Sequence, residues 1–194
     1  MDEKELIARM KAGDFEAFTE LLDAHKDKIY ALVHRLAGNK ENAEDIIQET
    51  FLKAIDNIGQ FRGDSSFGTW LYAIALNLSR AQFAAQKQVE LLPLEDYLPQ
   101  SGETHGSQSQ LFDWRDPHKV LETQELRKVI DEGLEKLPYQ YREAFLLRYY
   151  NDLTVKEVAE LTGQSEASAK SRILRARLAL RDFLARRFEG RYGK

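Results

Sequence analysis

Residues 154–180 read TVKEVAELTGQSEASAKSRILRARLAL, and this stretch predicts two helices joined by a tight turn. Thr154, with Glu157 three residues later, has the capping-box pattern of a helix start. Gly163 ends that helix, because glycine readily adopts the left-handed conformation found after a helix C-terminus. Ser165 caps a second, longer helix. A short capped helix, a tight turn and a second capped helix together form a helix-turn-helix pattern.

The second helix has two contrasting faces. At about 100° per residue, the inward face collects the apolar residues Ala169, Ile173, Ala176, Leu180, Phe183 and Leu184. The outward face near the helix start carries hydroxyls and cations at Ser168, Lys170, Ser171, Arg172 and Arg175. Short side chains let a helix enter a DNA major groove, while Arg and Lys bind guanine edges or phosphates. The pattern favours DNA contact by these five residues; the alternative is a basic helix face exposed only to solvent.

The charge of the chain is unevenly distributed. The formal net charge is −4 at pH 7, yet residues 138–194 carry 12 Lys and Arg against 7 Asp and Glu. We therefore expect a polyanionic partner to meet the C-terminal part of the chain rather than the whole molecule.

Residues 1–88 are predicted to form a domain of four helices. Gly13 closes a short first helix, Asp14 caps a long helix that Gly38 closes, and Asn39 caps the third. Residues 59–66 have the composition of a loop. The fourth helix has an apolar stripe at Trp70, Leu71, Ile74, Ala75 and Leu78. Apolar spacings of three and four, rather than two, disfavour strands throughout.

The remainder predicts a linker and a second helical domain. Residues 89–116 contain 6 acidic residues and 1 basic residue, and Pro93 and Pro99, so they are predicted to be a flexible acidic linker. Residues 117–194 are predicted to form the second domain. A helix begins at Asp116-Pro117, a second helix begins at Pro138, and the helix-turn-helix follows. The predicted fold class is all-α, with two small helical domains, the second winged-helix-like but built only of helices.

Several kinds of chemistry are disfavoured by composition. The chain has no cysteine, and its 4 histidines are scattered without ligand spacing, so we expect no disulfide, no metal and no cofactor. It has neither a glycine-rich phosphate loop nor a nucleophile elbow, and we expect no enzyme activity. No apolar run approaches the ~20 residues of a membrane span, and the charged start lacks a signal-peptide core, so we expect a cytoplasmic protein.

Two motif sets in the first and second halves resemble one known family. Residues 43–54 read AEDIIQETFLKA and residues 67–77 read FGTWLYAIALN; in the second half, residues 142–145 read REAF after Leu137-Pro138. These motifs resemble the bacterial sigma factors of the extracytoplasmic-function group, in both domains and in their order. The resemblance implies a dissociable, non-catalytic specificity subunit of RNA polymerase.

The resemblance also implies roles for two segments of the first domain. The helix carrying Asp45, Gln48, Glu49 and Leu52 is implied to dock on core RNA polymerase; these four residues share one helix face by their spacing. The loop at 61–67 and the following helix are implied to capture unstacked bases of the minus-ten promoter element. The candidate residues there are Arg62, Ser65, Phe67, Asn77 and Arg80. Alternatively, Phe67 staples the start of the helix.

This sequence departs from the family pattern at two places. After Asn77 only Arg80 and Lys87 are cationic, where family members usually carry several cations, so minus-ten affinity is expected to be low. At the start of the last helix, Ala167-Ser168-Ala169 stands where Gly-Thr-Val is common, which leaves the base preference open.

The expected partners follow from the resemblance. They are core RNA polymerase, promoter DNA whose minus-thirty-five element meets the helix-turn-helix, and an anti-sigma factor. The free protein is expected to be a monomer. The anti-sigma factor is implied to hold it in a closed state, in which the two domains pack together and mask their DNA-binding faces. Two rival interpretations remain at this point. One is a helix-turn-helix repressor or activator that dimerises through its first domain, and the other is a helical adaptor whose basic C-terminus only aids solubility.

Overall fold

The computed structural model describes residues 2–86 and 124–192, and the chain divides into two units, Met1–Leu91 and Leu92–Lys194. All regular secondary structure within the described residues is helical, in agreement with the predicted fold class. The predicted linker at 89–116 and the predicted helix start at Asp116-Pro117 lie outside the described residues. None of the helices in the described part has the length and apolarity needed to cross a membrane.

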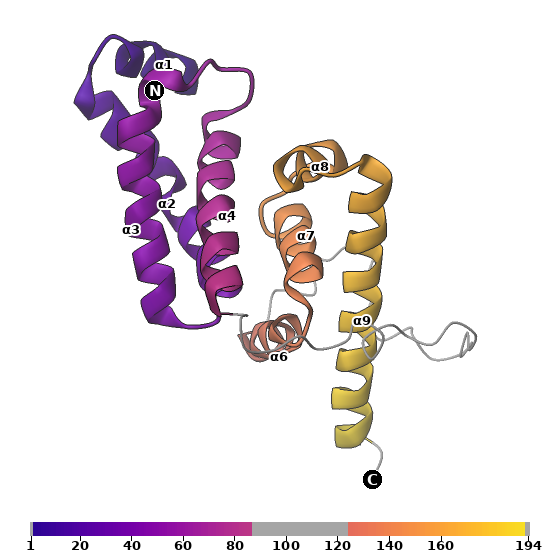
Figure 1. Ribbon diagram of the computed structural model, residues 1–194. Coiled ribbons are helices and arrows are strands. Elements are labelled where there is room, and N and C mark those ends of the chain that lie inside the picture. The colour runs from indigo at the N-terminus through magenta and orange to yellow at the C-terminus, as the bar shows by residue number, and fades with distance from the viewer. Residues whose placement is uncertain (1, 87–123, 193–194) are drawn as a thin grey trace. The chain divides into compact units, whose positions relative to one another are not determined.

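The N-terminal unit contains the four predicted helices and one additional short turn of helix. They are α1 (Glu3–Lys11), α2 (Phe15–Ala37), α3 (Lys40–Asn57), the 3-10 helix η1 (Ile58–Gln60) and α4 (Phe67–Gln86). Figure 1 shows α2, α3 and α4 side by side, with α1 at one end of them. Because α2 packs against α1, α3 and α4, it supplies much of the core, including Leu21, Ile29, Val33 and Leu36.

The predicted caps of this unit are confirmed. The Asp14 carboxylate accepts hydrogen bonds from the backbone N–H groups of Glu16 (3.0 Å) and Ala17 (3.1 Å) at the start of α2. Gly38 ends that helix with a φ of 75°, and the side chain of Asn39 accepts a bond from Asn42 N–H at 2.8 Å. These local signals place the helix boundaries because each satisfies backbone groups that the helix ends leave unpaired.

The apolar stripe predicted for α4 is buried at Leu71 and Ala75 but not at its other three positions. The buried positions include Leu71, Tyr72, Ala75 and Leu76, whereas Trp70, Ile74 and Leu78 of the predicted stripe are only half-buried. The physical reason is that α4 packs against both α2 and α3. Neighbouring residues lie about 100° apart around the helix axis, so packing on two helices also brings Tyr72 and Leu76 into the core.

The C-terminal unit is organised around its last helix. It contains α6 (Gln124–Glu135), α7 (Tyr139–Tyr149), α8 (Val155–Thr162) and α9 (Glu166–Tyr192), and α9 packs against the other three (Figure 1). The predicted inward face of α9 is buried at Ala169, Ile173, Ala176, Leu180 and Leu184. Phe183 is half-buried, with the Lys136 ammonium 4.7 Å above its ring. Pro138 caps α7 and thus precedes its first turn rather than lying within it.

The close approach of α6 to α9 requires a glycine at position 133. A Cβ atom there would lie 2.6 Å from Leu180 Cδ1 and 2.7 Å from Phe183 Cδ1. Leu180 is buried, so it has little room to move away.

We therefore expect Gly133→Ala to destabilise the C-terminal unit by about 1 kcal/mol. Overpacking costs roughly 1–3 kcal/mol, which exceeds the ~1 kcal/mol that a helix interior gains when Gly becomes Ala. Hydrogen exchange of the α6 and α9 amides in the full chain measures the effect on this unit. Lys128→Ala, at an exposed position of the same helix, is the control. Slower exchange in Gly133→Ala would show that the helices separate without cost.

The capping box at the start of α8 gives a second stability prediction. The Thr154 hydroxyl accepts a bond from Glu157 N–H at 3.2 Å and donates one to the Glu157 carboxylate at 2.7 Å; that carboxylate also accepts from Thr154 N–H at 2.8 Å. These hydrogen bonds, the one from the hydroxyl first, lower the pKa of Glu157. Because the pKa of Glu157 is lower in the folded state than in the unfolded state, its carboxylate stabilises the fold at pH values above its unfolded-state pKa. This stabilisation is lost as the pH falls through its folded-state pKa.

Thr154→Ala should cost about 1 kcal/mol at neutral pH, the usual cost of losing a helix N-cap. The cost should shrink as the pH falls through the folded-state pKa of Glu157, since the hydroxyl then loses its charged acceptor. Exchange rates of the α8 amides at several pH values test this, with the exposed Ser171→Ala as control. A pH-independent cost would rule out the carboxylate as the partner that matters.

Candidate nucleic-acid and partner-binding surfaces

The helix-turn-helix has the geometry that the sequence predicts. Gly163 has a φ of 65° and its N–H donates to the Glu160 carbonyl at 3.2 Å, which ends α8. The Ser165 hydroxyl then accepts from Ser168 N–H at 3.2 Å, so α9 starts directly after a tight turn. The inward side of α9 is fixed by its packing on α7 and α8. Its opposite side near the N-terminus is consequently available to a partner.

The five predicted contact residues of α9 differ in how they are presented. Lys170, Ser171 and Arg175 are exposed, and Arg172 is partly exposed. Ser168 is half-buried, and its hydroxyl donates to Gln164 Oε1 at 2.7 Å, so this hydroxyl is already engaged with the turn.

Two neighbours of this face were not recognised from the sequence. Tyr141 of α7 accepts a hydrogen bond from Arg175 Nη1 at 3.3 Å, which orients the guanidinium. Leu174 is 46% exposed between the hydroxyl and guanidinium groups, where an apolar group suits a thymine methyl. The Leu174 position is visible in the helical periodicity because it lies off the inward stripe, whereas the Tyr141 contact links residues 34 positions apart and leaves no local signal.

The loop between η1 and α4 is closed at each end by a buried aromatic residue. Phe61 is 3% exposed and Phe67 is 0% exposed, and their ring centroids lie 5.7 Å apart in an edge-to-face arrangement. Phe67 also contacts Phe18 at 6.4 Å and Trp70 at 5.6 Å between centroids. Phe67 is therefore not placed to hold an unstacked base, and that part of the prediction is corrected. The alternative, that Phe67 staples the start of α4, agrees with its position as the first residue of that helix.

The polar residues of this loop face solvent. Arg62 and Ser65 are exposed, and Arg62 Nε forms an exposed ion pair with Asp64 Oδ2 at 2.9 Å. Ser66 caps α4, because its hydroxyl accepts from Thr69 N–H at 3.1 Å. Trp70, a member of the predicted apolar stripe, is half-buried beside the loop, and its ring centroid lies 5.3 Å from that of Phe61. An aromatic ring at the loop remains available, but on Trp70 rather than Phe67.

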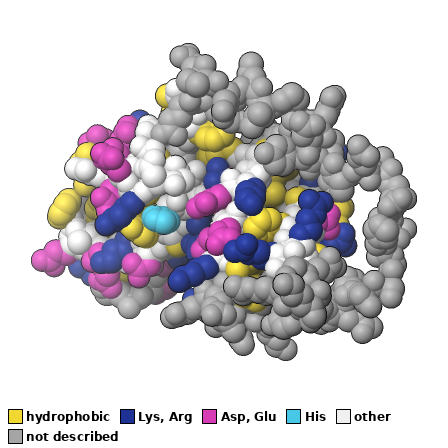
Figure 2. Space-filling model, turned by 90° about the horizontal axis from the view of Figure 1, so that it is seen from below, with side chains coloured by type: hydrophobic (Ala, Val, Ile, Leu, Met, Phe, Trp, Pro, Cys, Tyr) yellow, Lys and Arg dark blue, Asp and Glu magenta, His cyan; other side chains and the backbone are white. Residues whose placement is uncertain are grey.

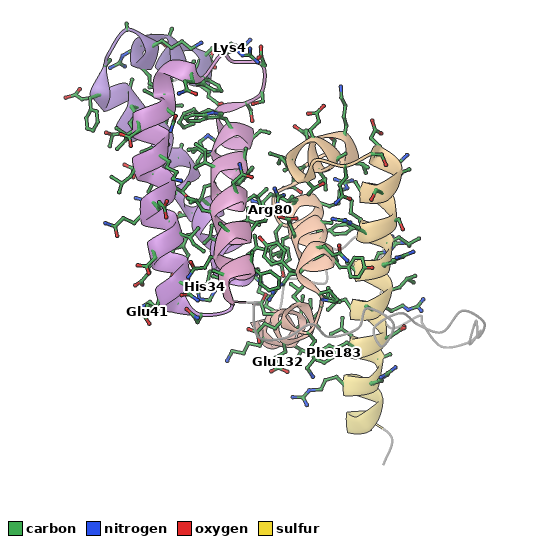
Figure 3. All side chains as sticks on the ribbon, in the orientation of Figure 1. Lys4, His34, Glu41, Arg80, Glu132 and Phe183 are labelled. Atoms are coloured by element: carbon green, nitrogen blue, oxygen red, sulfur yellow. The ribbon has the colours of Figure 1, made fainter. Side chains whose placement is uncertain are left out.

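The other two minus-ten candidates lie together further along α4. Asn77 is exposed, and its Oδ1 accepts a hydrogen bond from Arg80 Nη1 at 3.4 Å. Ten residues of helix rise about 15 Å, so this pair is well separated along α4 from the loop near Phe67. The structure thus places the candidates in two groups on the N-terminal unit, with Arg62 and Ser65 in one and Asn77 and Arg80 in the other. Arg80 is labelled on α4 in Figure 3.

The four predicted docking residues form one exposed strip on α3. Asp45, Gln48, Glu49 and Leu52, which we call the α3 strip, are all exposed. Glu49 pairs with Lys53 at 3.2 Å, with both side chains about half exposed. Leu52 is 54% exposed, and Ile55, three residues further along the helix, is 40% exposed. Exposed aliphatic groups flanked by carboxylates are typical of a protein-binding surface.

Some basic side chains of the chain lie close to carboxylates. Figure 2 shows Lys and Arg side chains interspersed with Asp and Glu on the described part of the face that it draws. Some cations of α9 are paired, as in the contact of Arg187 with Glu132 at 3.7 Å. Within residues 2–86 and 124–192, no group of three or more potential metal ligands gathers.

Comparison with known proteins identifies both halves of the chain. Residues 21–88 match the family model of Sigma-70 region 2, and residues 127–180 match that of Sigma-70, region 4. The ECF RNA polymerase sigma factor SigW of Bacillus subtilis is 38% identical over 178 residues, which cover 92% of this chain and 94% of that protein. The RNA polymerase sigma-H factor of Pseudomonas aeruginosa is 31% identical, with 92% of this chain and 91% of that protein covered.

Solved structures agree at the level of the fold. CnrH in complex with the cytosolic domain of CnrY has a TM-score of 0.66 and 23% identity, and the match covers 94% of this chain and 96% of that chain. RpoE in complex with the anti-sigma factor NepR from Bartonella quintana has a TM-score of 0.62 and 22% identity, covering 86% and 96%. Because the matched regions occur in the family's order and the curated relatives align over about nine-tenths of its length, this chain belongs to the ECF RNA polymerase sigma factors.

Proposed function

We propose that the chain binds core RNA polymerase through the α3 strip and directs it to promoters whose two elements meet the two units separately. The observation that carries this proposal is the placement of the exposed surfaces. The α3 strip and the loop lie on one unit, and the exposed start of α9 lies on the other. A protein with this division can hold polymerase and DNA at the same time.

Docking through the α3 strip follows from its chemistry. Asp45 and Glu49 offer negative charge, Gln48 offers an amide, and Leu52 adds exposed apolar area. A partner groove with Arg side chains and an apolar floor would satisfy all four groups. Ile55 extends the strip by one helical turn and increases the apolar area that such a groove would cover.

Minus-ten recognition is proposed for the loop and the outer face of α4. Arg62 is suited to a backbone phosphate and Ser65 to a base edge, while the half-buried Trp70 offers a ring for stacking. Asn77 and Arg80 extend the contact along α4. Phe67 contributes by shaping the loop from inside, because its ring is buried.

Minus-thirty-five recognition is proposed for the start of α9. Lys170, Ser171, Arg172 and Arg175 are at least partly exposed there, and Ser168 contributes through the turn that it stabilises. Charged groups set the affinity for phosphate, while Ser171, Arg175 and the exposed Leu174 are suited to base edges.

The solved structures suggest how the free chain is regulated. CnrH was solved in complex with the cytosolic domain of CnrY, and RpoE was solved in complex with the anti-sigma factor NepR. We propose that an anti-sigma factor likewise holds this chain when it is not bound to polymerase, that the free chain is a monomer, and that it acts in the cytoplasm. Sigma factors are non-catalytic subunits, and the exposure of Glu44, Asp45 and Glu49 supports a contact surface rather than an acid–base site.

The proposed function is tested by mixing the full chain with core RNA polymerase and promoter DNA. We expect co-elution with polymerase in size-exclusion chromatography, and protection of two separate promoter elements only when all three components are present. Tight binding of the chain alone, as a dimer, to a palindromic duplex would instead identify a repressor.

The α3 strip gives a first mutational prediction. Asp45→Arg combined with Gln48→Ala should weaken core binding by roughly 2–5 kcal/mol, because a new cation would face a groove suited to carboxylates. Circular dichroism should be unchanged, since both positions are exposed. Asp27→Arg, an equal charge reversal at an exposed position of α2, should bind core normally. Normal affinity of the double variant would refute docking through this strip.

The start of α9 gives a second prediction. Arg172→Ala or Arg175→Ala should weaken binding to the minus-thirty-five duplex by roughly 1–3 kcal/mol and leave core binding intact. Arg186→Ala is the matched control, because that arginine is exposed about 16 Å further along the same helix. If the minus-thirty-five element is protected equally by the wild type and by both arginine variants, the start of α9 does not read DNA.

A further inference from the structure

The first helix of the chain is fixed to the N-terminal unit at two levels. Leu6 and Met10 on its inner face are buried. At its C-terminal end, Arg9 binds the carboxylate of Asp14, the residue that caps α2. Arg9 Nη2 lies 2.7 Å from Asp14 Oδ2 in an ion pair, and Arg9 Nε donates a hydrogen bond to the same oxygen at 2.8 Å. The hydrogen bond to Asp14, followed by the charge of its carboxylate, raises the pKa of Arg9. The hydrogen bond from the backbone N–H of Ala17, followed by that from Arg9, lowers the pKa of Asp14. Because α1 is held in place, the backbone positions from which its other side chains extend are fixed relative to α2.

Two of these side chains reach the segment between η1 and α4, which we call the 61–66 loop. Lys11 Nζ donates to the Arg62 carbonyl at 3.4 Å and lies 5.5 Å from the centroid of the Phe61 ring. At the other end, Glu3 Oε1 accepts a hydrogen bond from the backbone N–H of Phe67 at 3.3 Å. The first helix therefore holds the loop both where it starts and where it ends.

Between the buried aromatic residues that close its ends, the loop is exposed to solvent at residues 62–66. Gly63 has a φ of 85°, a conformation that L side chains rarely adopt. Within the loop the Arg62–Asp64 ion pair is exposed, and exposed pairs contribute little. The contacts from Lys11 and Glu3 are made instead to backbone groups, which define the path of the chain. A loop held in its binding shape before the ligand arrives loses less conformational entropy when it binds.

We propose that α1 is a positioning element for minus-ten recognition, with Lys11 and Glu3 holding the 61–66 loop in the shape that accepts single-stranded promoter DNA. This inference rests on the proposed role of the loop in minus-ten binding. It goes beyond the family match, which begins at residue 21 and so leaves α1 outside the matched region. It also predicts that two charged residues without direct DNA contact control the affinity for the melted element.

The test uses the full chain bound to core RNA polymerase and a fluorescent single-stranded oligonucleotide carrying the non-template minus-ten sequence of a promoter mapped by footprinting. Lys11→Met removes the ammonium and keeps the length of the side chain, and Glu3→Ala removes the acceptor. Each should weaken oligonucleotide binding about two- to fivefold, the size expected for a contact of this kind at an exposed site. Each should also accelerate hydrogen exchange at residues 62–67 of the free full chain.

Matched variants separate positioning from charge and from general destabilisation. Lys4→Met removes one cation from an exposed position of the same helix, labelled in Figure 3, and should leave binding and exchange unchanged. Glu3→Gln keeps a side-chain oxygen as acceptor and should restore both. Binding of the minus-thirty-five duplex should be the same for every variant, because that element meets the other unit.

Two further variants distinguish failure of this inference from failure of the loop assignment. Arg62→Ala and Ser65→Ala alter the loop itself. If they weaken oligonucleotide binding while Lys11→Met and Glu3→Ala do not, α1 has no positioning role and the inference is overturned. If the loop variants also bind normally, the loop is not the minus-ten reader, and both the assignment and the inference that rests on it are overturned.

Discussion

Burial of the Phe67 ring is the interaction on which the N-terminal unit depends. This ring joins Phe18 of α2, Phe61 at the end of η1 and Trp70 of α4 in one aromatic cluster. Aromatic pairs of this kind contribute about 0.5–1.5 kcal/mol each beyond the area that they bury. Because the cluster includes the residues at both ends of the 61–66 loop, it couples the packing of three helices to the shape of the candidate DNA-binding loop. Gly68 allows the ring of His25 to pack here as well, since a Cβ would lie 2.9 Å from His25 Cε1, and burial lowers the pKa of this histidine.

The C-terminal unit exposes the outer face of the start of α9 while it buries the middle of the same helix. The left-handed turn at Gly163 and the capping box of α8 set the direction in which α9 leaves the turn. Packing of Ile173, Ala176 and Leu180 against the neighbouring helices then fixes its rotation. Small residues at 169 and 176 allow this close packing, and the cations between them point outward as a consequence. The hydrogen bond from Arg175 to Tyr141 links this outward face to the interior of the unit.

Local signals in the sequence predicted most helix boundaries, and long-range contacts explain what it missed. Asp14, Gly38, Asn39 and Gly163 act on backbone groups within a few residues, so their effect is readable from the sequence. The rotation of α4 depends on two neighbouring helices at once, and the apolar pattern alone predicted only part of its buried face. Sequence also cannot tell a buried phenylalanine from one that stacks on a base, because both uses need the same ring; burial decides the question for Phe67. The contacts of Lys11 and Glu3 span 51 and 64 residues and leave no periodic trace.

The two units of the chain are expected to act together in redirecting where polymerase starts RNA synthesis. Run-off transcription with core RNA polymerase, with and without the purified chain, measures this most directly when the 5′ ends of the transcripts are mapped. New, defined start sites should appear only when the chain is added, and they should lie just downstream of the two protected elements. Start sites that are identical with and without the chain would contradict it.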